Sequence, residues 1–363
     1  MSSSATRWRP APASTHWATR PWRCSPTGAA EAPVSDGAVS DGAVSGQSVR
    51  VAAIDCGTNS IRLLIADYAD GELTEVDRQM RIVRLGQGVD STGAFAPDAL
   101  IRTFAACGEY AEIVQAAGID RLRFVATSAA RDVSNRDEFF AGVSERLGVS
   151  PDIISGDEEA ALSFQGATGG LAALEVPGPY LVADIGGGST ELVLGDADGV
   201  LAAESLDMGS VRMTERHLHS DPATVEEMAA ATKDIDALLD STAVPLSKAR
   251  CLIGVAGTVT TVAAVALKLT EYDPGVIHHA RIHGDLLLDT TSWLMGATRM
   301  ARAAVPAIHP GRVDVIGAGA LILQRLHDRL DYDGVLVSEH DILDGVALAL
   351  ARAVSGSVPT DRT

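Results

Sequence analysis

The sequence has little lysine and an excess of acidic residues. It contains 29 basic residues against 48 acidic ones, for a net charge of −19, and its lysines are Lys233, Lys248 and Lys268. A chain this acidic is a poor non-specific binder of nucleic acid, because phosphate backbones attract basic surfaces. An anionic ligand would have to be held locally, by backbone N–H groups, a few arginines and bound cations.

Cysteines are few, and a membrane-length apolar segment is missing. Cys24, Cys56, Cys107 and Cys251 form no CxxC pair and have no metal-ligand spacing, so we expect reduced thiols. No apolar run reaches the roughly 18 residues that span a membrane. The arginine-bearing N-terminal stretch lacks the continuous apolar core of a secretory signal. These features predict a cytoplasmic protein without a membrane span.

The length and composition suggest two domains and a separate tail. A chain of 363 residues with 46% hydrophobic residues can bury two cores. Residues 1–48 are a low-complexity tail, in which residues 34–38 repeat at once as residues 39–43. We predict domains over residues 49–165 and 166–355, followed by a disordered tail over 356–363. Whether the final helix packs back on the first domain is left open.

Strand and helix patterns alternate along the folded part, which is typical of a mixed α/β fold. In the first half we expect strands at 50–56, 60–67, 71–83, 122–127 and 152–154, with helices at 97–117 and 136–147. In the second half we expect strands at 180–184, 190–195, 251–255 and 334–338. The helices expected there are at 209–218, 222–240, 284–302, 311–329 and 341–353.

An internal repeat is the most informative feature of the sequence. The pattern Asp-x-Gly-x-x-Ser occurs at residues 55–60 and again at residues 184–189. Each copy follows an apolar strand and precedes a second strand, an Asp-Gly turn and a third strand. Two similar domains that face each other would leave a cleft with one glycine turn on each wall, and such clefts commonly bind ligands.

The two glycine turns have the composition of phosphate-binding turns. Glycine lets the backbone approach an anion closely, and successive N–H groups can then converge on its oxygens. An ordinary hairpin turn is the alternative, but a second copy makes it much less plausible. The predicted phosphate-binding residues of the two turns are Gly57, Thr58, Asn59, Ser60, Gly186, Gly187, Gly188 and Ser189.

Acidic residues accompany both turns. Asp55 and Asp184 lie at the ends of their strands, next to the two turns, where they can hold a divalent cation directly or through water. Strand alternation places Glu191 on the same face as Ser189, as a further metal ligand or a group that orients water. Its alternative is a surface glutamate. The pattern around Glu159 by itself indicates only an acid favoured at a helix N-terminus.

Basic and glycine-containing segments complete the set of candidates. Among Arg62, Arg84, Arg131 and Arg212, we favour Arg131 as a phosphate ligand because it follows the end of a strand, where loops reach a cleft. Any single arginine is more often a solvated charge. Residues 254–261, with Gly257 and Thr258, form either a third phosphate- or nucleoside-contacting turn or a plain strand-to-helix turn.

Five segments together resemble the exopolyphosphatase/guanosine pentaphosphatase (Ppx/GppA) family over residues 50–353. They are Val51-Ala-Ala-Ile-Asp-Cys-Gly-Thr-Asn-Ser-Ile-Arg-Leu-Leu64, Ala126-Thr-Ser-Ala-Ala-Arg131, Ile154-Ser-Gly-Asp-Glu-Glu-Ala160, Asp184-Ile-Gly-Gly-Gly-Ser-Thr-Glu-Leu192 and Gly254-Val-Ala-Gly-Thr258. The resemblance implies a duplicated actin-like, ribonuclease-H-like fold with two domains that flank a cleft. It also implies the short, two-domain form of the family.

The same resemblance implies an activity, a cofactor and roles for residues. The activity is Mg²⁺- or Mn²⁺-dependent release of terminal phosphate from inorganic polyphosphate or, alternatively, from guanosine pentaphosphate. Glu159 falls on the family's catalytic glutamate, which activates water. Asp184 and Glu191 fall on acidic positions linked to metal and water, and Arg131 on a phosphate-contacting arginine. A non-catalytic sensor is the alternative of another class, and the intact acids argue against it.

Some expectations follow from departures from the family pattern. Ala161 stands where many members have arginine, so one positive contact is expected to be missing. The chain ends soon after the second domain, which puts processive action on long polyphosphate in doubt. We also expect a homodimer.

Overall fold

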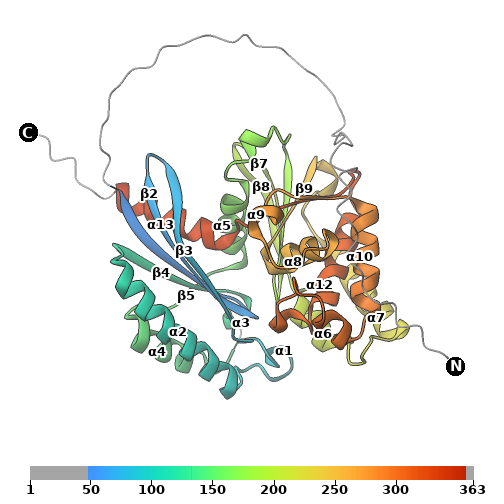
Figure 1. Cartoon of the computed structure of the whole chain (residues 1–363), viewed down its shortest axis with the longest axis horizontal. Coiled ribbons are helices and arrows are strands. Elements are labelled where there is room, and N and C mark those ends of the chain that lie inside the picture. Colours follow the sequence, from blue (N-terminus) through green and yellow to red (C-terminus); the bar gives the residue numbers. More distant parts are fainter. Residues whose placement is uncertain (1–47, 132, 357–363) are drawn as a thin grey trace, which may run out of the picture.

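Two mixed β-sheets lie side by side in the computed structural model, which describes residues 48–131 and 133–356 (Figure 1). The first sheet has the order β3-β2-β1-β4-β5. Strands β1, β2 and β3 form an antiparallel meander, and β4 and β5 run parallel to β1. Their bounds are β1 Val49–Cys56, β2 Ser60–Ala69, β3 Glu72–Ile82, β4 Arg121–Ala126 and β5 Asp152–Ile153.

The second sheet repeats this arrangement and adds one edge strand. Its order is β10-β11-β9-β6-β7-β8, in which β6, β7 and β8 form the meander and β9 and β11 run parallel to β6. The bounds are β6 Tyr180–Ile185, β7 Thr190–Asp196, β8 Gly199–Leu206, β9 Cys251–Val255, β10 Arg281–Ile282 and β11 Val335–Val337. The duplicated α/β topology confirms the expected fold class.

Helices cover both faces of the first sheet. Helices α2 (Pro97–Ala117) and α4 (Arg136–Leu147) pack on one face around the fully buried rings of Tyr110, Phe124 and Phe139. Helix α13 (Ile342–Gly356) packs on the other face, against apolar side chains of β1 and β2. Burial of each such large apolar side chain stabilises the fold by about 1.5–3 kcal/mol.

The second sheet is covered in the same way. One face carries α6 (Ser210–His217), α7 (Val225–Ser241), α8 (Ala256–Ala266), α10 (Gly284–Gly296) and α12 (Ile316–His327), and the other carries α5 (Gly156–Thr168). Shorter helices are α1 Val89–Thr92, α3 Ser128–Arg131, α9 Pro274–Ile277 and α11 Arg299–Ala303, with 3₁₀ turns at Leu171–Leu174, Leu246–Lys248 and Pro310–Arg312. No helix in the described part of the chain is long and apolar enough to cross a membrane.

Helices α5 and α13 cross each other at two glycines. A Cβ atom on Gly166 would lie 1.9 Å from the carbonyl oxygen of Asp341, and one on Gly345 would lie 2.0 Å from the carbonyl oxygen of Leu162. The crossing therefore brings α5, which packs on the second sheet, against α13, which packs on the first.

The domain boundary between residues 165 and 166 remains a prediction. Of the two predicted tails, residues 1–47 and 357–363 lie outside the described residues, whereas Gly356 is the last residue of α13.

Three expected helices have different limits in the structure. The helix expected at 284–302 is two helices, because the side chain of Thr298 accepts a hydrogen bond from the N–H of Ala301 (3.2 Å) and starts α11. The helix expected from 222 begins at Val225, after a capping box formed by Thr224 and Glu227. The helix expected from 311 begins at Ile316, after the 3₁₀ turn.

Candidate active site

The two glycine turns face each other across a cleft between the sheets. The cleft is lined by both turns and by the start of α8. A Cβ atom on Gly187 would lie 2.9 Å from Cβ of Thr58, and one on Gly188 would lie 2.6 Å from Oγ1 of Thr58. Glycine is therefore required here for the two walls to approach this closely.

The peptide groups of both turns are oriented for an anion. The carbonyl of Asn59 accepts hydrogen bonds from the N–H groups of Val83 (3.0 Å) and Arg84 (2.9 Å) and is thereby turned away from the cleft. The carbonyl of Gly187 is held similarly by the start of α6. Within residues 48–131 and 133–356, the N–H groups of Thr58, Asn59, Gly187 and Gly188 have no hydrogen-bond acceptor. Such free amides form an anion-binding nest.

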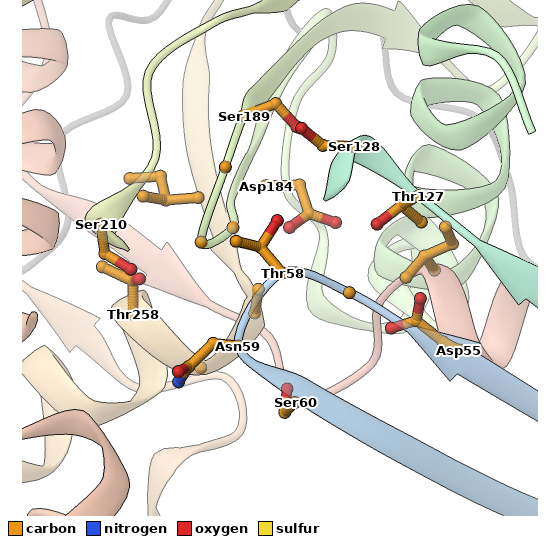
Figure 2. Close-up of a pocket in the computed structure, with 18 of the residues that line it drawn as sticks. Asp55, Thr58, Asn59, Ser60, Thr127, Ser128, Asp184, Ser189, Ser210 and Thr258 are labelled. Atoms are coloured by element: carbon orange, nitrogen blue, oxygen red, sulfur yellow. The ribbon is translucent and has the colours of Figure 1, made fainter. Parts of the chain in front are cut away.

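Hydroxyl groups supplement these amides. Figure 2 shows Ser210 and Thr258 together on one side of Thr58, with Asp55 and Thr127 on the other. The other predicted turn residues, among them Asn59, Ser60, Gly57, Gly186 and Ser189, also line the cleft. Gly257 and Thr258 lie in the first turn of α8, so the helix N-terminus is directed at the cleft and favours negative charge.

Four predicted acids are brought to the cleft region and are buried. Their exposed fractions are 4% for Asp55, 7% for Glu159, 6% for Asp184 and 1% for Glu191. Asp184 and Glu191 are direct partners in the β6–β7 register. Burial, together with the charges of Glu191 and Asp341, raises the pKa of Asp184 to about 8, although Ser163 Oγ donates to its Oδ2 at 2.6 Å.

Glu191 lies behind the lining of the cleft. Its Oε1 accepts hydrogen bonds from the hydroxyls of Ser189 and Ser205, each at 2.7 Å. Burial raises the pKa of Glu191 in spite of these two donors. The contact with Ser189 agrees with the prediction that the two residues lie on the same face of the strand. Through this contact Glu191 supports the second turn, and it also places a carboxylate near Asp184.

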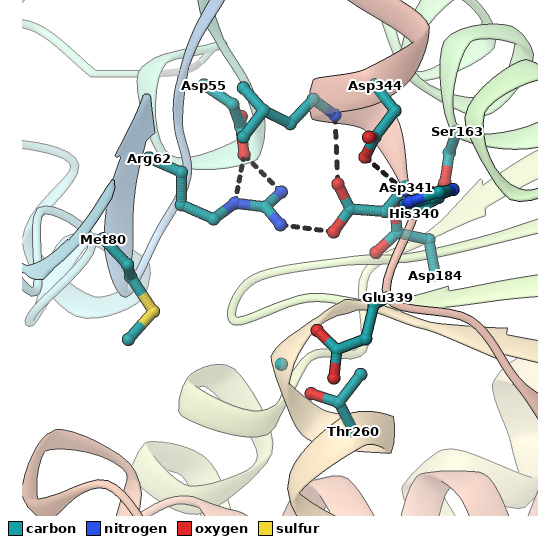
Figure 3. Close-up of polar contacts among 12 residues, drawn as sticks. Asp55, Arg62, Met80, Ser163, Asp184, Thr260, Glu339, His340, Asp341 and Asp344 are labelled. Carbon is teal, nitrogen blue, oxygen red and sulfur yellow. Dashed lines mark hydrogen bonds and ion pairs between the residues drawn. The ribbon is translucent and has the colours of Figure 1, made fainter. Parts of the chain in front are cut away.

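Arg62 lies between two buried carboxylates (Figure 3). Its Nε and Nη2 donate to Oδ2 of Asp55 at 3.1 and 2.6 Å, and its Nη1 donates to Oδ2 of Asp341. The second oxygen of Asp55, Oδ1, is buried without a hydrogen-bond partner. Burial opposes ionisation of Asp341, but the charges of Arg62 and Arg78 outweigh it and lower the pKa of Asp341. Sequence reasoning missed Asp341, which precedes α13 in no recognisable local pattern.

Glu159 and Arg131 form an ion pair. Glu159 lies in the first turn of α5, whose N-cap residue Ser155 accepts from the N–H of Glu158, and its Oε2 accepts from Nη2 of Arg131. Glu159 lines the cleft, whereas Arg131 stands behind it with its Nε buried and unpartnered. Arg131 is therefore placed to hold the Glu159 carboxylate in the arrangement described here.

Arg312 is a second functional candidate that sequence reasoning missed. Its Nη1 donates to the carbonyl of Gly257 and to Oγ1 of Thr261, both at 3.0 Å, and the side chain lines the cleft. Among the ion pairs of the described residues, none joins Arg312 to a carboxylate. Burial lowers its pKa. A Cβ atom on Gly257 would lie 1.9 Å from Nη2, so this glycine makes room for the guanidinium.

The predicted metal ligands do not converge into one coordination sphere. In the part of the chain that the structure describes, no group of three His, Cys, Asp or Glu residues could hold a metal ion as placed. Asp184 and Glu191 are neighbours, whereas Asp55 is engaged by Arg62. Hard carboxylate oxygens, the unpartnered Oδ1 of Asp55 and the raised pKa of Asp184 nevertheless fit a divalent cation, which would relieve the mutual repulsion of these acids.

Known proteins are similar to this chain over most of its length. The model of the Ppx/GppA phosphatase family matches residues 64–353. Exopolyphosphatase 2 of Mycobacterium tuberculosis is 51% identical over 317 residues, which cover 83% of this chain and 98% of that protein. A guanosine-5'-triphosphate,3'-diphosphate pyrophosphatase of Vibrio cholerae is 34% identical over 60% of this chain and 43% of its own length.

Solved structures agree with these sequence matches. The crystal structure of an exopolyphosphatase-like protein superposes with a TM-score of 0.82 at 44% identity, covering 85% of this chain and 99% of that one. The match to the family model begins within β2, just after the first glycine turn, and includes the second turn. The chain belongs to the Ppx/GppA phosphatase family.

Proposed function

We propose that this protein is an exopolyphosphatase, which hydrolyses the terminal phosphoanhydride bond of inorganic polyphosphate. The observation that carries the proposal is the position of Glu159 at the cleft between two amide-lined turns. The high identity to an exopolyphosphatase over nearly the whole of that relative supports the same activity. A linear polyanion suits a narrow cleft in which free N–H groups, hydroxyls and one arginine without a carboxylate partner surround the ligand.

The residues divide the work of hydrolysis among them. The free amides of the two turns and the guanidinium of Arg312 bind the terminal phosphates and orient them. Glu159 accepts a proton from the attacking water, whose oxygen forms a new bond to the terminal phosphorus. The bond from that phosphorus to the bridging oxygen breaks, and the shortened chain leaves with the electron pair. Arg131 must release Glu159 for this step, and we infer that it turns to the phosphate oxygens.

A divalent cation completes the proposed site. Asp55 and Asp184, with Glu191 behind them, would hold Mg²⁺ or Mn²⁺ through carboxylate oxygens. When bound, the cation supplies positive charge to the phosphate oxygens and to the leaving group. We further propose that the protein acts in the cytoplasm as a homodimer. The buried free thiols of Cys56 and Cys107 are consistent with a reducing compartment, and sedimentation at varied protein concentration tests the dimer.

Guanosine pentaphosphate is the second candidate substrate. A second pocket adjoins the cleft and shares Arg62, Gly257 and Arg312 with it. The walls of this second pocket include Met80 and Tyr272, apolar or aromatic surface that a bare polyphosphate chain does not need. A nucleoside would use such a wall, so the second pocket is the observation that favours the alternative.

Phosphate release tests the two substrates against each other. The protein is incubated with Mg²⁺ and, separately, tripolyphosphate, long-chain polyphosphate, guanosine pentaphosphate and ATP. We expect the highest kcat/KM with inorganic polyphosphate. A higher kcat/KM with guanosine pentaphosphate would favour the alternative, and binding of tripolyphosphate without any phosphate release would identify a sensor.

A further inference from the structure

A segment that leaves β3 is tied to the first glycine turn. We name residues 83–93 the strap. At its base, the N–H groups of Val83 and Arg84 donate to the carbonyl of Asn59, and the N–H of Gly86 donates to the carbonyl of Thr58 at 2.8 Å. A Cβ atom on Gly86 would lie 2.2 Å from Cγ2 of Thr58. The strap therefore cannot move at its base without moving the first turn.

The tip of the strap is tied to helix α6 of the other half. The carboxylate of Asp90 accepts from Nη1 of Arg212 and, at 2.7 Å, from Nε of Arg216. The N–H of Gly88 donates to Oε1 of Glu215 at 3.3 Å. The two arginines lower the pKa of Asp90, as expected for a carboxylate that both of them stabilise.

Helix α6 in turn holds the second glycine turn. The N–H of Ser210 donates to the carbonyl of Gly186 at 2.9 Å, and Nε of Arg212 donates to the carbonyl of Gly188 at 2.7 Å. A Cβ atom on Gly209 would lie 2.4 Å from the carbonyl carbon of Gly187. Arg212 thus contacts the second turn with one nitrogen and the strap with another.

We propose that Asp90, Arg212 and Arg216 form a brace that sets the spacing of the two phosphate-binding turns. These are positioning residues: they line no part of the cleft itself and act through the strap and α6. The kinetic part of the test rests on the proposed function, whereas the distance measurement does not. A brace across the cleft favours the closed arrangement before substrate arrives, so its loss lowers the fraction of binding-competent protein and weakens apparent affinity in proportion.

The structure supplies a matched control for this cluster. The carboxylate of Asp236 in α7 is likewise ion-paired with two arginines, Arg325 and Arg329, but all three residues lie within the second half, away from the cleft. The side chains of Asp90 and Asp236 are equally exposed, at 27%. Asp236→Asn therefore removes a similar carboxylate without touching the strap.

The test compares the full chain with Asp90→Asn, Asp90→Glu and Asp236→Asn. Hydrolysis of tripolyphosphate gives kcat and KM. The distance between the halves is measured between spin labels at Gln115→Cys and Asp289→Cys, in a chain whose Cys24 is replaced by serine. For Asp90→Asn we expect a KM raised about tenfold, a kcat within about threefold of wild type, and a broader, longer distance distribution that saturating tripolyphosphate restores. Asp90→Glu should recover most of the KM, and Asp236→Asn should change neither readout.

A wild-type KM and distance distribution in Asp90→Asn would overturn the proposal. Equal effects of Asp90→Asn and Asp236→Asn would overturn it too, because they would indicate general destabilisation. If wild type releases no phosphate, the proposed function fails, while the distance measurement and calorimetric binding of tripolyphosphate still judge the brace. If Asp90→Asn does not fold, Arg216→Gln replaces it in the same test. This variant leaves Arg212 in place, so we expect a smaller rise in KM, and the same results would overturn the proposal.

Discussion

At the scale of single residues, charge pairing decides what each buried group of the cleft can do. Glu159 is paired with Arg131, and Asp55 with Arg62, whereas no carboxylate of the described residues pairs with Arg312. Arg312 is half-buried, and the charge of Glu339 acts on it without forming an ion pair. Its charge is therefore less compensated in the free protein than that of a paired arginine. On the proposed function an entering anion supplies the missing partner, so we expect Arg312 to contribute more to substrate binding than an exposed arginine would.

Replacement of Arg312 should weaken substrate binding. For Arg312→Met, which keeps most of the volume, we expect KM for tripolyphosphate to rise by about tenfold or more, because a charge-assisted contact to phosphate is lost. Arg352→Met in α13, at an exposed position, is the control and should leave KM unchanged. An unaltered KM in Arg312→Met would remove Arg312 from the binding site.

We propose that Asp184 links stability, pH and metal binding. Its pKa is about 8 in the metal-free fold and near 4 in an unfolded chain, so its contribution to stability is lost as pH rises from about 4 to about 8. A cation must displace the retained proton at low pH. We therefore expect Mg²⁺ to raise Tm by about 3 °C more at pH 8.5 than at pH 6.

Calorimetry of two variants separates Asp184 from other acids. Asp184→Asn should lose most of the Mg²⁺-induced rise in Tm at pH 8.5, whereas Asp198→Asn, at an exposed turn, should keep it. The metal assignment would be wrong if Mg²⁺ raised Tm equally in wild type and Asp184→Asn at both pH values.

At the scale of elements, sequence predicted best what local patterns determine. Helices 97–117 and 136–147 and strand 251–255 were expected within the limits that the structure gives them. The break before α11 depends on one threonine cap within an apolar stretch, which periodicity does not reveal. Arg312 and Asp341 were missed because their roles come from partners distant in sequence: Asp341, for example, meets Arg62, 279 positions away.

The crossing of α5 and α13 depends on glycine at both contact points. For Gly345→Ala we expect the free energy of unfolding to fall by about 1–3 kcal/mol, because the added methyl group would meet the backbone of Leu162 and force the helices apart. The matched change Gly108→Ala in α2, where a Cβ meets no atom within 4 Å, should stabilise by about 0.5–1 kcal/mol. Denaturant titration distinguishes these opposite signs; equal effects would contradict a close crossing.

At the scale of the whole molecule, duplication places two similar glycine turns on opposite walls of one cleft, where on the proposed function they bind one polyanion from two sides. Two copies of a meander with parallel strands present equivalent glycine turns to each other, and α5 and the strap connect the copies. On the proposed function, the turns bind phosphate, and Glu159, which lines the same cleft, is the base that hydrolysis requires.

Phosphate release by Glu159→Gln tests this central claim most directly. The control is Glu158→Gln, the preceding acid, which is about half exposed and contacts Arg123 at 2.7 Å. With Mg²⁺ and saturating tripolyphosphate, we predict that Glu159→Gln lowers kcat by about 10²-fold or more while tripolyphosphate still binds, and that Glu158→Gln stays within about threefold of wild type. A Glu159→Gln enzyme with wild-type kcat would contradict the account.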